Sequence, residues 1–365
     1  MGFEIKKCTT EKETAGSLRL ILGVIGAHSP LAKRKLSHFF KIHASKPSTD
    51  TIILRSGGSI LGTLQVVGKE LKVFNSVVPV DGITNVCVDP RHQGKGLGAE
   101  LMYFANRILD ERSKAASILV ARRAVDGFYA RFGFLGTGCF TEMVIPSEEY
   151  NAAKNTGNIT FRTGPAHKKA GEYKKLYDKT YNTIPFSFHR DREWWENMEM
   201  WYKFKVRHRE FVNVIRGEKI LGYFICQNGR IIEAACSDAG AFCNALLLFA
   251  KRKNMPELVI TCAPGHSCNR YLQKINHTLK MRRAWDGGHM MRANDKAKFL
   301  DIVDLYLRQG FSSCSGIEGL SKAKDVLKRI LDQKNMPGLL HNEVYPDVMN
   351  AGDMFGHGWS VVDEF

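Results

Sequence analysis

Residues 86–99 read Val-Cys-Val-Asp-Pro-Arg-His-Gln-Gly-Lys-Gly-Leu-Gly-Ala. The apolar start predicts a strand that ends at Asp89-Pro90, and a helix is expected from about Gly96. The glycines at 94, 96 and 98 let the backbone curl and approach a ligand closely. The helix N-terminus adds a partial positive charge, and Arg91 and Lys95 add full charges nearby. The stretch therefore predicts a cradle for an anionic group such as a pyrophosphate.

Two familiar phosphate-binding loops do not fit this stretch. A Walker A loop needs a lysine followed by serine or threonine after its last glycine, and that pair is missing here. A dinucleotide fingerprint needs a glycine where this chain has Ala99, and it opens its fold rather than following a fourth strand. A plain tight turn is the alternative for the glycines. Solvated loop charge is the alternative for Arg91 and Lys95.

Hydrophobic patterns around the loop predict one mixed sheet with helices on its faces. Strands are expected at 3–7, 51–55, 60–67, 82–88, 117–120 and 134–144, and helices at 10–25, 29–43, 96–112 and 125–132. The order β-α-α-β-β-β-α-β-α-β is typical of a single α/β unit. We assign this first domain to residues 1–146.

A polar linker follows at 147–157, and residues 158–296 repeat the β-β-β-α-β-α order more loosely. Residues 297–365 read as helices with an aromatic, apolar tail that ends at Phe365. The predicted fold class is therefore α/β with mixed (α+β) sheets: two similar units plus a small, mostly helical C-terminal extension.

Composition excludes several classes of protein. The chain has 365 residues, a formal net charge of +16 and 44% hydrophobic residues, which is typical of a globular protein. Apolar runs are too short for a membrane helix, and no signal-peptide pattern opens the chain. The nine cysteines include no C-x-x-C pair, which predicts reduced thiols, a cytoplasmic protein and no metal site. No nucleic-acid-binding signature accompanies the positive charge.

Two motifs carry a family resemblance. The spacing Gln93-x-x-Gly96-x-Gly98 after a strand that ends Val-Asp-Pro resembles the acetyl-CoA loop of the GNAT acyltransferase family. Phe128-Tyr-Ala-Arg-Phe-Gly-Phe134 resembles the segment that follows the fifth strand in that family. Both motifs occur in the family's order, and the resemblance covers about residues 3–145.

The resemblance implies a site in which the fourth and fifth strands splay apart around the pantetheine arm of acetyl-CoA. The implied cofactor-binding residues are Val86, Cys87, Val88, Arg91, Gln93, Gly94, Lys95, Gly96, Leu97, Gly98 and Ala99. Tyr129 would protonate the departing thiolate, because a phenol with a pKa of about 10 suits a thiolate with a pKa of about 9. The alternative for Tyr129 is a core aromatic residue.

The tandem arrangement resembles the enhanced-intracellular-survival (Eis) type of this family. The second unit has no counterpart of residues 93–98, so we expect it to wall the acceptor cleft without binding CoA. In that type the terminal carboxylate, here that of Phe365, is the catalytic base. An ordinary docked tail is the alternative, and Glu142, His28 and His289 are internal candidates for the base. The stretch 297–365 departs from that type, because it lacks a sterol-carrier-like sheet.

The implied function is an acetyl-CoA-dependent N-acetyltransferase that acts by direct attack of an amine, without a metal. The acceptor would be a small-molecule or peptide amine, with neither membrane nor nucleic acid as a partner; a homo-oligomer stays open. The basic charge counts against a polycationic acceptor unless the cleft is acidic. An acyl intermediate on Cys87 would need a paired base, and none is evident. The alternative is a non-catalytic acyl-CoA-binding or interaction protein on the same scaffold.

Overall fold

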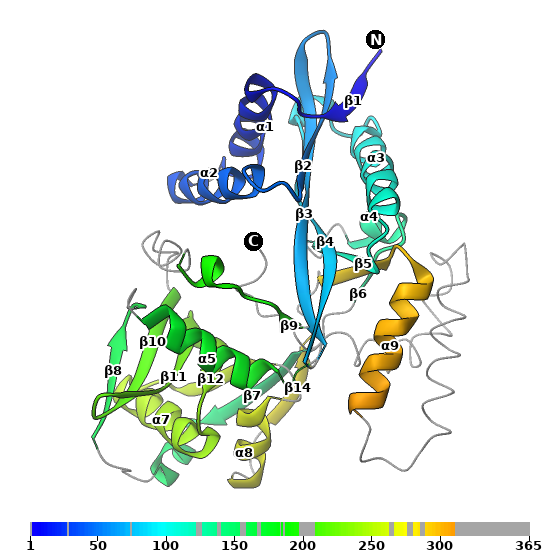
Figure 1. The fold of residues 1–365 in the computed structure, drawn as a ribbon. Helices are drawn as coiled ribbons and strands as arrows, with labels where there is room; N and C mark the ends of the chain where they lie inside the picture. The colour runs from blue at the N-terminus through cyan, green and yellow to red at the C-terminus, as the bar shows by residue number, and fades with distance from the viewer. Residues whose placement is uncertain are drawn as a thin grey trace.

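The computed structural model describes most of the chain up to residue 310. The described ranges are 2–27, 29–73, 75–121, 126–136, 140–153, 158–165, 169–182, 184, 187–196, 209–262, 266–275, 280–284 and 289–310. They form two sheets with helices on their faces (Figure 1). The mixed α/β prediction is therefore confirmed.

The first sheet is built around a long hairpin of two strands. Its strands, in spatial order, are β1 (Glu4–Lys7), β2 (Thr49–Ser56), β3 (Ser59–Val73), β4 (Ser76–Val88), β5 (Ala116–Val120), β15 (His289–Ala293) and β6 (Leu135–Gly136), and β9 (Ser187–Phe188) pairs with the outer part of β3. β3 and β4 are longer than the sequence predicts, because their outer halves run on past the region where β5 pairs. This outer part of the hairpin points toward the second sheet (Figure 1).

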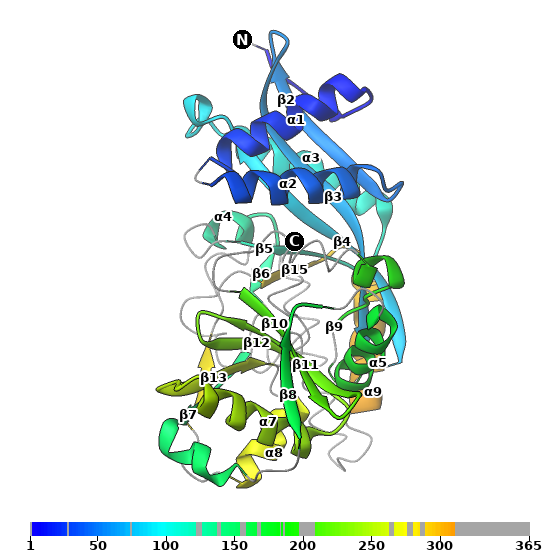
Figure 2. The ribbon, with the colours of Figure 1, turned by 90° about the vertical axis from the view of Figure 1, so that its left-hand side faces the viewer.

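Helices cover both faces of the first sheet. α1 (Glu11–Val24) and α2 (Pro30–Ala44) lie on one face, and α3 (Leu97–Arg112) and α4 (Asp126–Ala130) lie on the other (Figure 2). Thr10 caps α1 by accepting a hydrogen bond from the Glu13 amide at 3.2 Å. Ser29 caps α2 in the same way, and Pro30 starts that helix without losing a needed donor.

The second sheet carries helices on both faces as well. Its strands, in spatial order, are β14 (Lys280–Ala284), β7 (Phe140–Pro146), β13 (Glu257–Cys262), β12 (Arg230–Cys236), β11 (Lys219–Gln227), β10 (Arg209–Arg216) and β8 (Ile159–Thr163). α7 (Ala239–Arg252) and α8 (Ser267–Ile275) pack in one hydrophobic core. α5 (Ala170–Tyr181) packs in a separate aromatic core with Trp195.

The two sheets exchange strands. β7, which the sequence places at the end of the first domain, pairs with β13 and β14 of the second sheet. In return, β15 pairs with β5 and β6 of the first sheet. The sheets therefore do not divide at the linker predicted for 147–157, where the structure has the short helix η3 (Ser147–Ala152). An apolar strand pattern specifies a buried strand but not the sheet that it joins.

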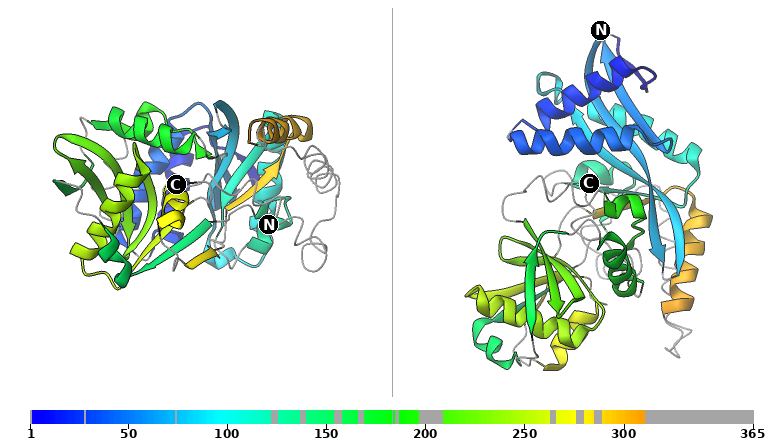
Figure 3. Two further views of the ribbon diagram at one scale, coloured as in Figure 1. Left: turned by 90° about the horizontal axis from the view of Figure 1, so that it is seen from below. Right: turned by 60° about the vertical axis from the view of Figure 1, so that its left-hand side comes forward.

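The start of the C-terminal extension belongs to the first unit. α9 (Lys296–Gly310) lies beside the β3–β4 hairpin (Figure 3). Its Phe299 and Val303 pack in one core with Leu71, Ile118 and Met291. The rest of the extension lies outside the described residues.

Two composition-based expectations can be checked against the described residues. Cys8, Cys87, Cys226, Cys236, Cys243, Cys262 and Cys268 are free thiols, and all but Cys8 are buried. Cys139 and Cys314 lie outside the described residues. In the part of the chain that is described, no helix is long and apolar enough to cross a membrane.

Candidate active site

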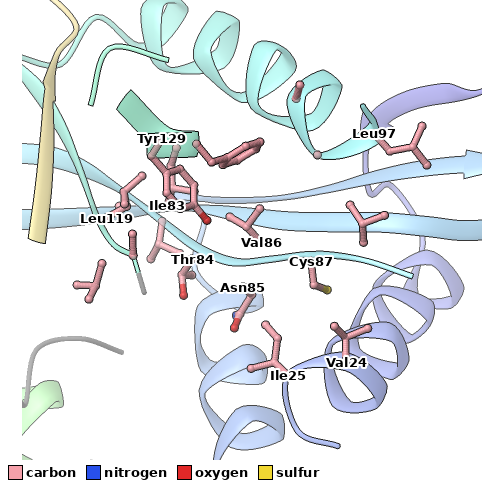
Figure 4. A pocket seen from close by; sticks show the side chains of 18 of the residues that line it. Val24, Ile25, Ile83, Thr84, Asn85, Val86, Cys87, Leu97, Leu119 and Tyr129 are labelled. Carbon is pink, nitrogen blue, oxygen red and sulfur yellow. The ribbon is translucent and has the colours of Figure 1, made fainter. Parts of the chain in front are cut away.

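A cavity of about 1070 Å³ runs along residues 82–88 of β4. Its walls come from β4, β5, the turn before α3, α4 and the ends of α1 and α2 (Figure 4). Tyr129 lies on one side of β4, and Asn85 and Ile25 lie on the other (Figure 4). The cavity thus passes between the two helix-covered faces of the first sheet.

The cavity exists because β4 and β5 separate. The two strands pair in parallel only from Asp81–Ser117 to Ile83–Leu119. Directly after that, Asn85 has a φ of 57°, and the β3–β4 register shifts between Thr63 and Gln65. This is a β-bulge, which bends the strand that carries it, and asparagine tolerates the left-handed conformation better than most residues. The bulge therefore turns β4 away from β5 and opens a slot.

The slot exposes backbone groups of β4. The Asp89 amide donates to Leu61 O of β3 at 2.8 Å. Because successive residues of a regular strand turn their N–H groups to opposite sides, the Val88 amide faces the slot. Val88 O on that side accepts a hydrogen bond from Gln93 Nε2 at 3.1 Å. The slot edge can therefore pair with an extended ligand as a further strand would.

The turn after β4 is held by an ion pair. Asp89 Oδ1 accepts from the Arg91 backbone N at 3.0 Å and from its Nε at 3.1 Å, and Asp89 Oδ2 accepts from the Arg91 guanidinium at 2.7 Å. These bonds hold the pKa of the Asp89 carboxyl well below its usual range. Arg91 is 82% exposed. Its guanidinium fixes the turn, so the predicted contact between Arg91 and a phosphate stays a prediction.

The glycines of the turn allow α3 to begin with backbone amides that could bind an anion. Gly94 and Gly96 have φ values of 75° and 80°, which side chains rarely tolerate. Gly96 caps α3 without a side-chain hydrogen bond, and the first helical bond runs from Ala99 N to Gly96 O at 2.9 Å. The Leu97 and Gly98 amides therefore have no acceptor within the helix. Lys95 is exposed beside them.

Tyr129 lies on α4 against the slot. Its ring packs edge-on against Phe128 at a centroid distance of 5.0 Å. Burial raises the pKa of Tyr129 to about 12, and the nearby Cys87 adds to the shift. Burial also raises the pKa of the Cys87 thiol to about 12. Tyr129 is thus a protonated donor at neutral pH, whereas Cys87 is a poor nucleophile, because the thiolate is the reactive form.

Of the four candidates for the base, the structure describes the side chain of Glu142 alone. Glu142 lies on β7 in the second sheet, where it accepts a hydrogen bond from Arg230. The backbone of His289 pairs with Val120 at the end of β5, but its side chain lies outside the description. His28 and Phe365 lie outside the described residues altogether.

Several cavity residues were not foreseen from the sequence. Val24 and Ile25 at the end of α1, Leu36 of α2 and Phe188 of β9 line it. Asn85 was missed too, although an asparagine inside the apolar run 83–88 could have indicated a bulge. The others carry no local signal, because ordinary apolar residues look the same in a core and in a cavity wall.

The corresponding slot of the second unit is filled. β12 and β13 pair in parallel only at Arg230–Val259 and Ile231–Ile260. Beyond that point the fully buried His266 donates from Nε2 to Ala234 O at 2.9 Å, while its Nδ1 accepts from the Cys268 amide at 3.1 Å. The N-terminus of α7 is capped by Asp238, which accepts from Ala241 N at 3.1 Å. In the second unit, a histidine thus bonds the backbone where β12 and β13 separate, and a carboxylate caps the helix that follows β12.

Sequence comparisons show which known proteins the first unit resembles. Residues 6–135 match the model of the acetyltransferase (GNAT) domain. An uncharacterized N-acetyltransferase from Streptomyces avermitilis is 28% identical over 146 residues, which are 38% of this chain and 34% of that protein. The chain thus matches about a third of the length of this curated relative.

Structural similarity extends over both units. A probable N-acyltransferase from Enterococcus faecalis has a TM-score of 0.62 at 15% identity, over 82% of this chain and 75% of that one. A GCN5-related N-acetyltransferase from Anabaena variabilis has a TM-score of 0.62 at 13% sequence identity, over 82% of this chain and 75% of that one. Eis1 from Mycobacterium abscessus has a TM-score of 0.58 at 15% sequence identity, over 82% of this chain and 76% of that one. These similarities confirm the predicted fold class. Residues 6–135 are therefore a GNAT acetyltransferase domain, within a chain that shares its overall fold with Eis1.

Proposed function

We propose that this protein transfers an acetyl group from acetyl-CoA to an amine by direct attack. A GNAT domain supports acetyl transfer in general. The observation that carries the finer proposal is the slot between β4 and β5, which has an anion-ready helix start at one end and a protonated phenol beside it.

The coenzyme would occupy this slot along its length. The amides of residues 94–98 and the side chains of Gln93 and Lys95 would receive the pyrophosphate, since helix N-termini and curled glycine backbones favour anions. The backbone of residues 86–88 would pair with the pantetheine arm. The Val88 amide, which faces the slot, would polarise the thioester carbonyl as the amine attacks.

Tyr129 would then protonate the departing thiolate. Because burial raises the pKa of Tyr129 to about 12, the phenol keeps its proton until a thiolate forms beside it and can then donate that proton to the sulfur. The base that takes the proton of the amine stays a prediction for the Phe365 carboxylate.

The test is a thiol-release assay with acetyl-CoA and a panel of amines. Tyr129→Phe removes the proton donor but keeps the ring, so we expect kcat to fall by about 100-fold or more. Isothermal titration calorimetry should give an unchanged Kd for acetyl-CoA, which separates loss of chemistry from loss of binding. Full turnover by Tyr129→Phe would exclude the phenol as the acid. Tight binding without turnover of any amine by the wild type would favour the non-catalytic alternative.

A further inference from the structure

The face of the cavity toward α1 and α2 contains one polar side chain with a fixed orientation. Asn85 Nδ2 donates to Gln65 Oε1 at 2.9 Å. Gln65, which is fully buried, donates from Nε2 to Thr51 Oγ1 at 3.1 Å. This relay runs across β2, β3 and β4 and commits the amide nitrogen of Asn85 to the sheet.

The relay determines which Asn85 atom a ligand can meet. With Nδ2 bound to Gln65, the carbonyl Oδ1 is the group left on the cavity side. Figure 4 shows the Asn85 side chain extending from β4 toward Ile25, on the side of the strand opposite Tyr129. Because Asn85 is also the bulge residue, it stands where β4 leaves β5. An oxygen acceptor is thus held at the mouth of the slot, on the face away from the proton donor.

The lining of the cavity as a whole is largely apolar, and its charged groups are basic. Val24, Ile25 and Leu36 line the cavity from the helix side. The charged or protonatable nitrogen groups in the lining belong to His43, Lys69, His92 and Arg131. Within the described residues, the lining includes no carboxylate. A multiply charged cation would meet repulsion here without a counter-charge, whereas apolar surface would gain free energy by burial.

We propose that this face binds the acceptor and that the acceptor is a primary amine on an apolar group, with Asn85 Oδ1 holding its nitrogen. The inference rests on the proposed function and identifies the substrate class of that site. An amide oxygen accepts an N–H bond without stabilising the ammonium form as a carboxylate would. The ammonium form can therefore release its proton to solvent water, and the neutral nitrogen can attack the thioester from the face opposite Tyr129.

The test compares two amines and three variants. The amines are 2-phenylethylamine, which is apolar with one amine, and 1,4-diaminobutane, which carries two. Asn85→Gly keeps the left-handed backbone but removes the carbonyl, and Asn85→Asp replaces it with a carboxylate. Asn228→Gly is the matched control, because Asn228 has a similar φ of 51° in the β11–β12 turn, outside the cavity. Calorimetric binding of acetyl-CoA is measured for every variant.

For the wild type we expect a higher kcat/KM for 2-phenylethylamine than for 1,4-diaminobutane. Asn85→Gly should raise the KM for 2-phenylethylamine about tenfold, the effect of losing one hydrogen bond, while acetyl-CoA binding and Asn228→Gly stay unchanged. Asn85→Asp should shift the kcat/KM ratio about tenfold toward the diamine, which a merely structural role would not do.

Three outcomes would overturn the inference while the proposed function stands: a wild type that prefers the diamine, an unchanged amine KM in Asn85→Gly, or an unchanged ratio in Asn85→Asp. Turnover of neither amine, with acetyl-CoA still bound, overturns the inference too. If every other amine in the thiol-release panel also fails, the proposed function falls with it.

Discussion

At the scale of single residues, the site depends on backbone conformations that few side chains accept. Gly94, Gly96 and Asn85 all have positive φ, and each stands where the chain changes direction around the cavity. The glycines were evident from the sequence because glycine spacing is a local property. The role of Asn85 was not, because a bulge is defined only against the partner strand.

Gly96→Ala tests whether the turn before α3 binds the anionic part of acetyl-CoA. A side chain at φ 80° strains the backbone by about 1 kcal/mol or forces the turn to rearrange, so the Leu97 and Gly98 amides lose their common direction. We expect the Kd for acetyl-CoA to rise at least tenfold in calorimetry. Gly57→Ala is the control, since Gly57 has a φ of 54° and open space around it but lies in the β2–β3 turn. Unchanged affinity in Gly96→Ala would contradict the assignment.

At the scale of elements, two parallel strands separate in each unit, but the gap between them differs. In the first, the gap between β4 and β5 is a cavity; in the second, His266 bridges the gap between β12 and β13. Burial lowers the pKa of His266 to about 4. The sequence indicated that a glycine turn is missing from the second unit, but not that a histidine 30 residues after Cys236 fills the slot.

His266→Gln tests this filling through the pH dependence of stability. Because the folded pKa of His266 lies below the unfolded value of about 6.5, its contribution is complete above pH 6.5 and is lost as pH falls toward 4. Glutamine can still donate to Ala234 O but does not titrate. We expect the wild type to lose about 2 kcal/mol more than the variant between pH 7 and pH 5 in urea unfolding. The buried His43, whose pKa of about 3 is lowered by burial, contributes equally to both proteins. Parallel pH profiles would contradict the prediction.

At the scale of the whole molecule, the exchange of β7 and β15 makes the two units interdependent. The first sheet needs β15 to cover the edge of β5, and the second needs β7 between β13 and β14. An uncovered apolar strand edge favours aggregation. The strand β5, which lines the cavity, is thus stabilised by a residue range that lies more than 150 positions later in the chain.

A fragment of residues 1–157 should therefore not fold alone. It lacks β15 and carries β7 without its partners. We expect no cooperative thermal transition and no acetyl-CoA binding, measured by circular dichroism and calorimetry. Co-expression with a fragment of residues 158–365 should restore both. A 1–157 fragment that binds acetyl-CoA as tightly as the full chain would show that the exchange is dispensable.

The order of strands and helices up to α4, the glycine turn before α3 and the position of Tyr129 in α4 could be derived from the chain without coordinates, whereas β9, β14 and β15 were not predicted. Each of the derived features depends on residues that are neighbours in sequence, where hydrophobic period, glycine conformation and helix capping act locally. The partners of β7 and β15, the bulge that opens the slot and the histidine that closes its counterpart became evident only in the folded molecule. They depend on pairings between distant segments, and a strand's own pattern gives its buried faces but not its neighbour.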